Sequence, residues 1–314
     1  MTKPVVVGVD GSPSSLDAVE TASGEARIRG AELRLVHAFG RSSAHLPAGG
    51  PPWSPAGTGV RELVDGTLAV AERRARDAAP HVAVTRDVTL GDPLAVLEIA
   101  SRTASLVVVG SRGLGAVGGL LLGSTSVHLA AHSHCPVLVV RGRPHPAGPL
   151  VLAVDESPGS GHAARFAFTE AHLRGVGLTL LHVCRPGDPE AYDGPADPPF
   201  VTYDEALLRT KAEHVLDTVL AGRAERYPDV TVTRRTVVGR VRHSVVEASS
   251  GAQLLVVGAR GHGGFTGPLL GSVSQAALHH AHCPVAVVRH RSSAPEADGP
   301  PPDRTGTATG EPRP

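Results

Sequence analysis

Val-Val-Gly-Ser-Arg-Gly at 108–113 returns as Val-Val-Gly-Ala-Arg-Gly at 256–261, and this repetition decides the fold. Leu-Leu-Gly-Ser at 121–124 likewise returns at 269–272, and in both cases the second copy lies 148 positions after the first. Solenoids are built from much shorter repeats, whereas an interval of this length corresponds to a whole domain. The sequence therefore predicts two copies of one domain.

Each copy alternates short apolar runs with longer mixed segments, which is the pattern of strands alternating with helices. In the first copy we expect strands near 5–9, 33–37, 82–89, 106–110 and 136–140, and helices near 14–29, 60–78, 93–103 and 124–132. In the second copy we expect strands near 150–154, 178–183, 230–238, 253–257 and 284–288. The runs are rich in valine, as is typical of parallel strands buried on both faces. Each copy is therefore predicted to be an α/β domain with a doubly wound, five-stranded parallel sheet.

The predicted domains occupy residues 1–141 and 149–290, and a short Pro-containing linker joins them. The Gly- and Pro-rich segment 40–59 and its counterpart 185–199 are too long for routine connections, so we expect them to be mobile or functional. Residues 291–314 are rich in Pro, Gly and Thr and have no apolar periodicity, which predicts a disordered C-terminal tail.

The composition narrows the function classes. Thirty Lys and Arg residues balance thirty Asp and Glu residues, so a basic surface for nucleic acid or an anionic membrane is not expected. The three cysteines form no CxxC pair and no even disulfide framework. The N-terminus lacks the pattern of a signal peptide, and no apolar stretch has the length needed to span a bilayer. We therefore expect a cytoplasmic protein.

A split glycine motif, G-x2-G-x9-G-S, follows the fourth predicted strand of each copy, at 110–124 and at 258–272. Glycine at the end of a strand lets the backbone approach a phosphate closely and reach positive φ. A serine that opens the next helix lies beside free N–H groups that favour an anion. Turn-forming glycines and a helix cap would explain a single copy, but the unchanged spacing in two copies favours a phosphate site.

Asp10 and Asp155 end the first predicted strand of their copies and precede a Ser-Pro helix start. Ligands of open α/β sheets lie outside the carboxyl ends of the strands, at the switch point where the first and fourth strands are neighbours. Asp10 and Gly110 are therefore expected to converge on one crevice, although an aspartate here is also a common turn or cap residue.

These motifs and the closing Cys-Pro-Val-x-Val-Val-Arg resemble the ATP-binding branch of the universal stress protein family, over residues 3–141 and 149–289. The resemblance implies an adenine nucleotide alpha hydrolase-like sheet with strand order 3-2-1-4-5. It also implies ATP in each copy, with Mg²⁺ as a candidate partner of the phosphates. The backbone at the end of the second strand would hold adenine, the aspartate would lie near the ribose, and the glycine segment would wrap the ribose and phosphates.

The implied nucleotide contacts fall on matching positions of the two copies. They are Val9, Asp10, Gly11, Ser12, His37, Ala38, Gly110, Arg112, Gly113, Gly123, Ser124, Thr125 and Ser126 in the first copy, and Val154, Asp155, Ser157, His182, Val183, Gly258, Arg260, Gly261, Gly271, Ser272, Val273 and Ser274 in the second. Glu156 stands where the first copy has Gly11. A carboxylate near the phosphates is expected to weaken binding at the second site, and the alternative is an ordinary acidic residue that stabilises the dipole at the first turn of the helix.

Two other readings of the glycine segment are set aside. Residues 113–118 spell G-x-G-x-x-G, but they follow the fourth strand, and Thr266 replaces the last glycine in the second copy. Residues 118–125 imitate a P-loop, but Ser124 stands in place of its lysine, so fast phosphoryl transfer is not expected.

A metal site is also not expected. His-x-His-Cys ends at Cys135 and again at Cys283, and zinc binds such side chains. However, the fourth candidate ligand, His128, aligns with Ala276, so the constellation is not duplicated.

Three functions remain open for the two crevices. The favoured one is a regulatory protein of the stress response that binds ATP and is not an enzyme. The second is a slow ATPase or phosphotransferase, which is less favoured because no catalytic pair or triad can be assigned. The third is an interaction scaffold with vestigial sites. The family resemblance further implies that the two halves form an intramolecular pseudo-dimer through their fifth strands, with a homodimer of whole chains as an additional expectation.

Overall fold

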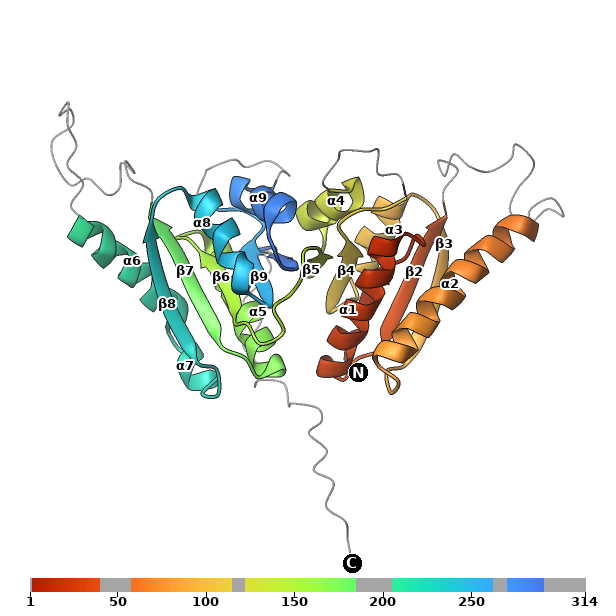
Figure 1. Ribbon diagram of the computed structural model, residues 1–314, viewed down its shortest axis with the longest axis horizontal. Helices are drawn as coiled ribbons and strands as arrows, with labels where there is room; N and C mark the ends of the chain where they lie inside the picture. Colours follow the sequence, from red (N-terminus) through yellow and green to blue (C-terminus); the bar gives the residue numbers. More distant parts are fainter. Residues whose placement is uncertain (1, 40–57, 115–121, 185–204, 262–269, 291–314) are drawn as a thin grey trace, which may run out of the picture. The chain divides into compact units, whose positions relative to one another are not determined.

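The computed structural model describes residues 2–39, 58–114, 122–184, 205–261 and 270–290. These residues form two compact units, one ending at Val140 and the other beginning at Arg141. Figure 1 shows that each unit is a parallel β-sheet covered by helices. The long segments expected to be mobile or functional and the expected C-terminal tail lie almost wholly outside the described residues.

The first unit alternates strands and helices along its whole length. Its elements are β1 (Val5–Gly8), α1 (Pro13–Arg29), β2 (Leu33–Phe39), α2 (Thr58–Ala78), β3 (Val84–Leu90), α3 (Pro93–Ala100), β4 (Leu106–Gly110), α4 (Ser124–His132) and β5 (Val137–Val140). The strands are parallel and lie in the order β3-β2-β1-β4-β5. Helices α1 and α2 pack together, as do α3 and α4. The predicted doubly wound sheet with order 3-2-1-4-5 is confirmed.

The second unit repeats this arrangement. Its elements are β6 (Leu150–Val154), α5 (Pro158–Arg174), β7 (Leu178–Cys184), α6 (Glu205–Leu220), α7 (Arg223–Arg226), β8 (Val232–Val238), α8 (Val241–Ala248), the short 3-10 helix η3 (Ser249–Gly251), β9 (Leu254–Gly258), α9 (Ser272–His280) and β10 (Val285–Val288). The parallel order is β8-β7-β6-β9-β10, which is again 3-2-1-4-5.

The first helix of each unit begins and ends where the sequence dictates. Ser12 caps α1 by accepting a hydrogen bond from the Ser15 N–H, and Pro13 fills the first turn, where its missing N–H costs nothing. Gly30 ends the helix in the left-handed conformation, which glycine adopts without strain. Helix α5 has the same Ser-Pro start and a left-handed glycine at its end.

The central strands of each sheet are the most buried. Val5, Val6 and Val7 of β1 and the first three residues of β4 are fully buried, because helices cover both faces of the sheet at this point. The outer strands β3 and β8 carry exposed Thr and Arg side chains instead, as is usual for edge strands. The carboxyl ends of β1 and β4 therefore lie at the middle of a rigid sheet, where the strand order reverses.

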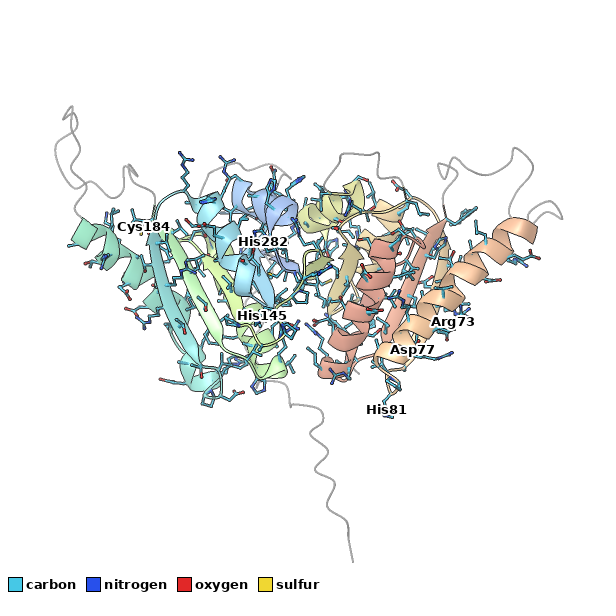
Figure 2. All side chains as sticks on the ribbon, viewed as in Figure 1. Arg73, Asp77, His81, His145, Cys184 and His282 are labelled. Atoms are coloured by element: carbon cyan, nitrogen blue, oxygen red, sulfur yellow. The ribbon has the colours of Figure 1, made fainter. Side chains whose placement is uncertain are left out.

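The predicted linker packs against the second unit. The N–H of Arg143 donates to the carbonyl of His282 at 2.9 Å, and the N–H of His145 donates to the carbonyl of Ala252 at 3.1 Å. Both histidines are labelled in Figure 2. Gly142 has a φ of +57° and leaves no room for a side chain, because a Cβ would lie 2.1 Å from the same His282 oxygen. The segment is thus an ordered part of the second unit rather than a loose connection.

Among the helices in the described ranges, none has both the length and the apolar character that crossing a membrane requires.

Candidate functional site

The carboxylate of Asp10 joins the end of β1 to the glycine segment after β4. Its Oδ1 accepts a hydrogen bond from the Ser12 N–H at 2.9 Å, and its Oδ2 accepts one from the Leu114 N–H, also at 2.9 Å. Leu114 directly follows the second glycine of the motif. The structure thus brings Asp10 and the glycine segment together at the switch point of the sheet.

The hydrogen bonds also hold Asp10 in its charged form. Burial by itself would raise the pKa of this carboxyl, but the hydrogen bonds from Ser12, Leu114 and Ser15 outweigh it, and the pKa lies below its usual value. Asp10 is therefore ionised at neutral pH, and both of its oxygens already accept bonds from the protein.

Asp155 has the same position in the second unit but a somewhat different set of partners. Its Oδ1 accepts hydrogen bonds from the Ser157 N–H at 3.0 Å and from the Ser160 hydroxyl at 2.8 Å. Position 262, which corresponds to Leu114, lies outside the described residues. A Cβ on Gly261 would lie 2.4 Å from Asp155 Oδ2, so the aspartate and the glycine segment are in close contact here as well.

The motif glycines are required for close packing and not for positive φ. A Cβ on Gly110 would lie 2.5 Å from the Ser14 carbonyl oxygen, and one on Gly113 would lie 2.6 Å from Asp10 Oδ2. Neither glycine has a left-handed φ, nor do their counterparts Gly258 and Gly261, so the expectation of positive φ is wrong for these four. Gly11, which lies outside the motif, has a φ of +86°.

The two serines that open α4 and α9 are not helix caps. Ser124 and Ser272 are the first helical residues, and the caps are Gly123 and Gly271, which have no side chain to bond the helix amides. Both serines are exposed at the helix N-terminus. The amide-rich end of each helix thus remains a favourable place for an anion.

Two further serines, Ser126 on α4 and Ser274 on α9, bond to the backbone of the first motif glycine of their unit. The Ser126 hydroxyl donates to the Gly110 carbonyl at 2.8 Å, and the Ser274 hydroxyl donates to the Gly258 carbonyl at 2.6 Å. Both side chains are buried. They hold the end of the strand against the helix, while Thr125 and Val273 between them are half-buried.

The histidines near the ends of the second strands, His37 and His182, are fixed in the same way in both units. Nδ1 of His37 lies 2.8 Å from the Val9 carbonyl oxygen, and Nδ1 of His182 lies 3.0 Å from the Val154 carbonyl oxygen. Because a carbonyl oxygen only accepts, Nδ1 must carry the proton, and Nε2 is left as an acceptor in the neutral ring. Ala38 and Val183, the other predicted adenine contacts, follow in β2 and β7.

The remaining predicted contacts lie on the loops that meet at the crevice. The side chains of Arg112 and Arg260 are exposed, and the backbone of Arg112 contacts Ser12 and Ser14. Ser14 was not predicted as a site residue, although it lies in the same Ser-Pro-Ser-Ser helix start. Ser14 packs against Gly110 at the end of β4, and a contact between such distant segments is not visible in the sequence.

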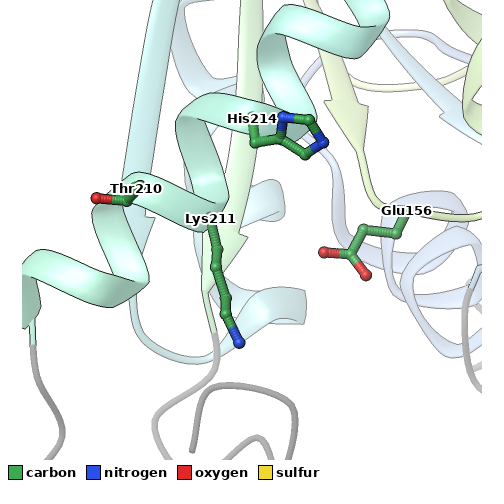
Figure 3. Close-up of a pocket in the computed structure, with 4 residues that line it drawn as sticks. All are labelled: Glu156, Thr210, Lys211 and His214. Carbon is green, nitrogen blue, oxygen red and sulfur yellow. The ribbon is translucent and has the colours of Figure 1, made fainter. Parts of the chain in front are cut away.

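Glu156 lines a pocket in the second unit. The pocket has a volume of about 470 Å³ and is also lined by Thr210, Lys211 and His214 of α6. Figure 3 shows the Glu156 carboxylate on the side of the pocket that the His214 ring faces. The buried residues Leu208, Ala212 and Val215 of α6 match Val64, Leu68 and Ala71 of α2 at an interval of 144 positions, so Thr67 stands where the second unit has Lys211. The carboxylate expected to repel phosphates thus shares its pocket with a cation.

No three His, Cys, Asp or Glu side chains of the described residues are grouped so that they could hold a metal ion. Cys283 is buried, and its burial raises the pKa of the thiol to about 12. Cys184 ends β7 (Figure 2) and packs with Leu208 and Ala212 of α6. Both cysteines thus behave as small apolar core residues.

Comparisons with known proteins agree with this architecture. The sequence model of the universal stress protein family matches residues 1–141 and 147–289. Universal stress protein Rv1996 of Mycobacterium tuberculosis is 36% identical over 316 residues, with 91% of this chain and 94% of that protein covered. Universal stress protein Rv2623 of the same organism is 37% identical over 295 residues, with 91% and 96% covered.

A solved structure shares the fold at lower sequence identity. The crystal structure of a universal stress protein from Archaeoglobus fulgidus has a TM-score of 0.66 and 20% identity, with 92% of this chain and 97% of that chain covered. The family match includes both halves, and the similarity to the mycobacterial proteins extends over nearly their whole length. The chain therefore belongs to the universal stress protein family, as a tandem of two such domains.

Proposed function

We propose that this protein is an ATP-binding regulator of the stress response, with one nucleotide in each of its two crevices. The observation that carries the proposal is the cradle formed by Asp10, Gly110 and Gly113, which recurs around Asp155. In each unit the second motif glycine packs so closely against the aspartate that no side chain fits there, and only main chain stands at this position. Main-chain N–H groups at the start of a helix are well suited to phosphate oxygens.

Several site features favour binding over catalysis. Both oxygens of Asp10 accept protein N–H groups, and its pKa lies below the usual value because these hydrogen bonds outweigh the effect of burial. A carboxylate of this kind is a poor general base. The position of the P-loop lysine is taken by Ser124, so the chain supplies no fixed cation there for a transferring phosphoryl group. We therefore propose that hydrolysis of ATP, if it occurs, is slow.

Two additional parts of the proposal rest on the family. The relatives named above are universal stress proteins, which is why we place the nucleotide-dependent role in the stress response. The apolar sequences of β5 and β10 support the proposal that the two halves form an intramolecular pseudo-dimer.

The decisive experiment identifies what the purified protein carries. Ligand released from protein by denaturation is identified by mass spectrometry, and ATP is then titrated into stripped protein by calorimetry. About two equivalents of ATP per chain, with no turnover over the hours of the titration, are the expected result. Failure of ATP to bind would leave the scaffold function, and rapid release of ADP and phosphate would leave the ATPase.

A further inference from the structure

A groove between α8 and α9 of the second unit has no assigned role. It has a volume of about 470 Å³, which is within the usual size range of small-molecule sites. Four of its lining side chains are basic or can become so, namely Arg242 and His243 of α8 and His279 and His280 of α9. The groove reaches Ser272, the first residue of α9.

The equivalent helices of the first unit are joined where the second unit has this groove. Nε2 of His128 on α4 lies 2.8 Å from Oε2 of Glu98 on α3. The positions 148 residues later are Ala276 and Val246, two smaller apolar side chains that line the groove. The second unit therefore lacks the polar bridge between these helices.

The two units also differ in charge at this place. Arg242, His243 and His279 stand where the first unit has Leu94, Ala95 and Ala131. Three positions that are uncharged in the first unit thus carry Arg or His in the second unit. They lie on α8 and α9, the two helices between which the His–Glu bridge is absent. The absence of the His–Glu bridge explains the apolar Ala276 and Val246 but does not explain the three basic residues beside them. These basic residues point to a ligand with negative charge.

The charges around the groove are mostly of one sign. Glu247 is the nearby carboxylate, 3.5 Å from His243 Nε2 on the same helix. The pKa of His279 is lowered by burial and then by the neighbouring His280 and Arg141. Arg141 is itself held against α9, where its Nη1 donates to the carbonyl of residue 277 at 3.0 Å. An anion in the groove would oppose the repulsion from His280 and Arg141 and favour protonated His279.

We propose that the α8–α9 groove of the second unit binds a small organic phosphate. Arg242 and His279 hold the phosphate, and a guanidinium is well suited to this because it can donate two parallel hydrogen bonds. Val246 and Ala276 lie under the carbon skeleton of the ligand. The cavity is much larger than a phosphate ion, which is why the ligand is organic.

The probe for this site is phenyl phosphate, a phosphate with an apolar body, titrated by calorimetry into the full-length protein. One saturable site per chain is expected, with affinity at least about tenfold weaker in Arg242→Leu, which restores the residue of the first unit. The double variant Val246→Glu/Ala276→His should rebuild the bridge of the first unit and weaken binding by a similar factor. Inorganic phosphate should bind more weakly than phenyl phosphate, because it gains nothing from the apolar floor.

The control variant is Arg235→Leu, which removes the same charge from edge strand β8 outside the groove. It should bind phenyl phosphate like the unaltered protein. No saturable binding to the unaltered protein would overturn the proposal, and so would binding to Arg242→Leu and to the double variant that is as tight as binding to the unaltered protein. Displacement of phenyl phosphate by ATP with no effect of either variant would place it in the nucleotide crevice, and this would also overturn it.

The pH dependence supplies an independent test. Because bound phosphate favours the protonated form of His279, binding should strengthen as the pH falls from 8 to 6 and should take up a proton. In His279→Gln this gain should shrink clearly, while His243 and His280 remain. The imidazole NMR signal of His279 should titrate at higher pH when phenyl phosphate is present, and an unchanged titration would refute the assignment of His279.

Discussion

Replacing Gly113 with alanine tests whether the contact between Asp10 and the glycine segment organises the first site. The new Cβ would lie 2.6 Å from Asp10 Oδ2, whereas ordinary contact begins near 3.4 Å, so the two groups must separate by about 0.8 Å. The adjacent hydrogen bond from the Leu114 N–H to the same oxygen is 2.9 Å long. A displacement of this size along the bond takes it beyond the distance at which a hydrogen bond is effective.

The expected cost follows from the loss of this bond. A hydrogen bond to a charged group contributes about 1.5–3 kcal/mol, and Asp10 is only partly buried, so we expect a loss of about 2 kcal/mol in the free energy of unfolding. For a unit of this size that corresponds to a fall of about 4–8 °C in Tm. The affinity for ATP should fall as well, because the displaced segment carries the backbone that faces the phosphates.

Two glycine variants provide controls for urea unfolding and ATP calorimetry. Gly24→Ala introduces a Cβ with no atom within 4 Å and should be neutral or slightly stabilising in helix α1. Gly123→Ala brings its Cβ no closer than 3.5 Å to the protein, so it should lower ATP affinity with little steric cost to the fold. If Gly113→Ala were as stable as the unaltered protein, the argument from the Asp10 contact would be refuted.

Three other predictions follow from the same structure. Asp10→Asn should reduce the free energy of unfolding most at neutral pH and little at acidic pH. A carboxyl whose pKa is lowered in the folded state stabilises the fold at pH values above its ordinary pKa of about 4, and this stabilisation disappears as the pH falls. Urea unfolding from pH 7 to 3 measures the difference. Gly142→Ala should cost more than Gly222→Ala in the free energy of unfolding, since both have left-handed φ (+57° and +70°) but only the first Cβ meets a carbonyl oxygen, at 2.1 Å. Lys211→Gln should weaken ATP binding at the second site more than Glu156→Gln changes it, because loss of the cation leaves the carboxylate uncompensated in their shared pocket; calorimetry on both variants decides.

The sequence predicted the sheet well because the decisive signals are local and occur twice. Valine-rich runs mark the buried strands, and a Ser-Pro pair and a glycine bound the first helix of each unit. The two glycine motifs begin at the ends of the fourth strands, β4 and β9, as predicted. What the sequence located less well are ends of elements, such as α3, which ends at Ala100 rather than near 103.

The details of the site were harder to predict, since they depend on contacts between distant segments. The sequence suggested positive φ at the motif glycines, whereas Gly110 and Gly113 are needed because Ser14 and Asp10 pack against them. The family resemblance placed Ser126 among the residues around the ribose and phosphates, and the bond from its buried hydroxyl to a carbonyl 16 residues earlier is visible only in the fold. The pocket around Glu156 was missed because its other lining residues come from a helix more than 50 residues later in the chain.

The two units retain the same interior and differ at the surfaces around it. The Asp–glycine contact, the histidine bond to the first strand and the buried serine behind the glycines recur in both, and each of these holds the backbone of the cradle. The side chains beside the cradle have changed, as Thr67 in the first unit and Lys211 in the second illustrate. Mutations in the packed cradle reduce the free energy of unfolding, whereas changes of exposed side chains alter it little. A duplicated domain therefore diverges mainly in the exposed side chains around the cradle. The two sites should therefore bind the same class of ligand with different affinities, and a titration curve described well by two identical sites would contradict this reasoning.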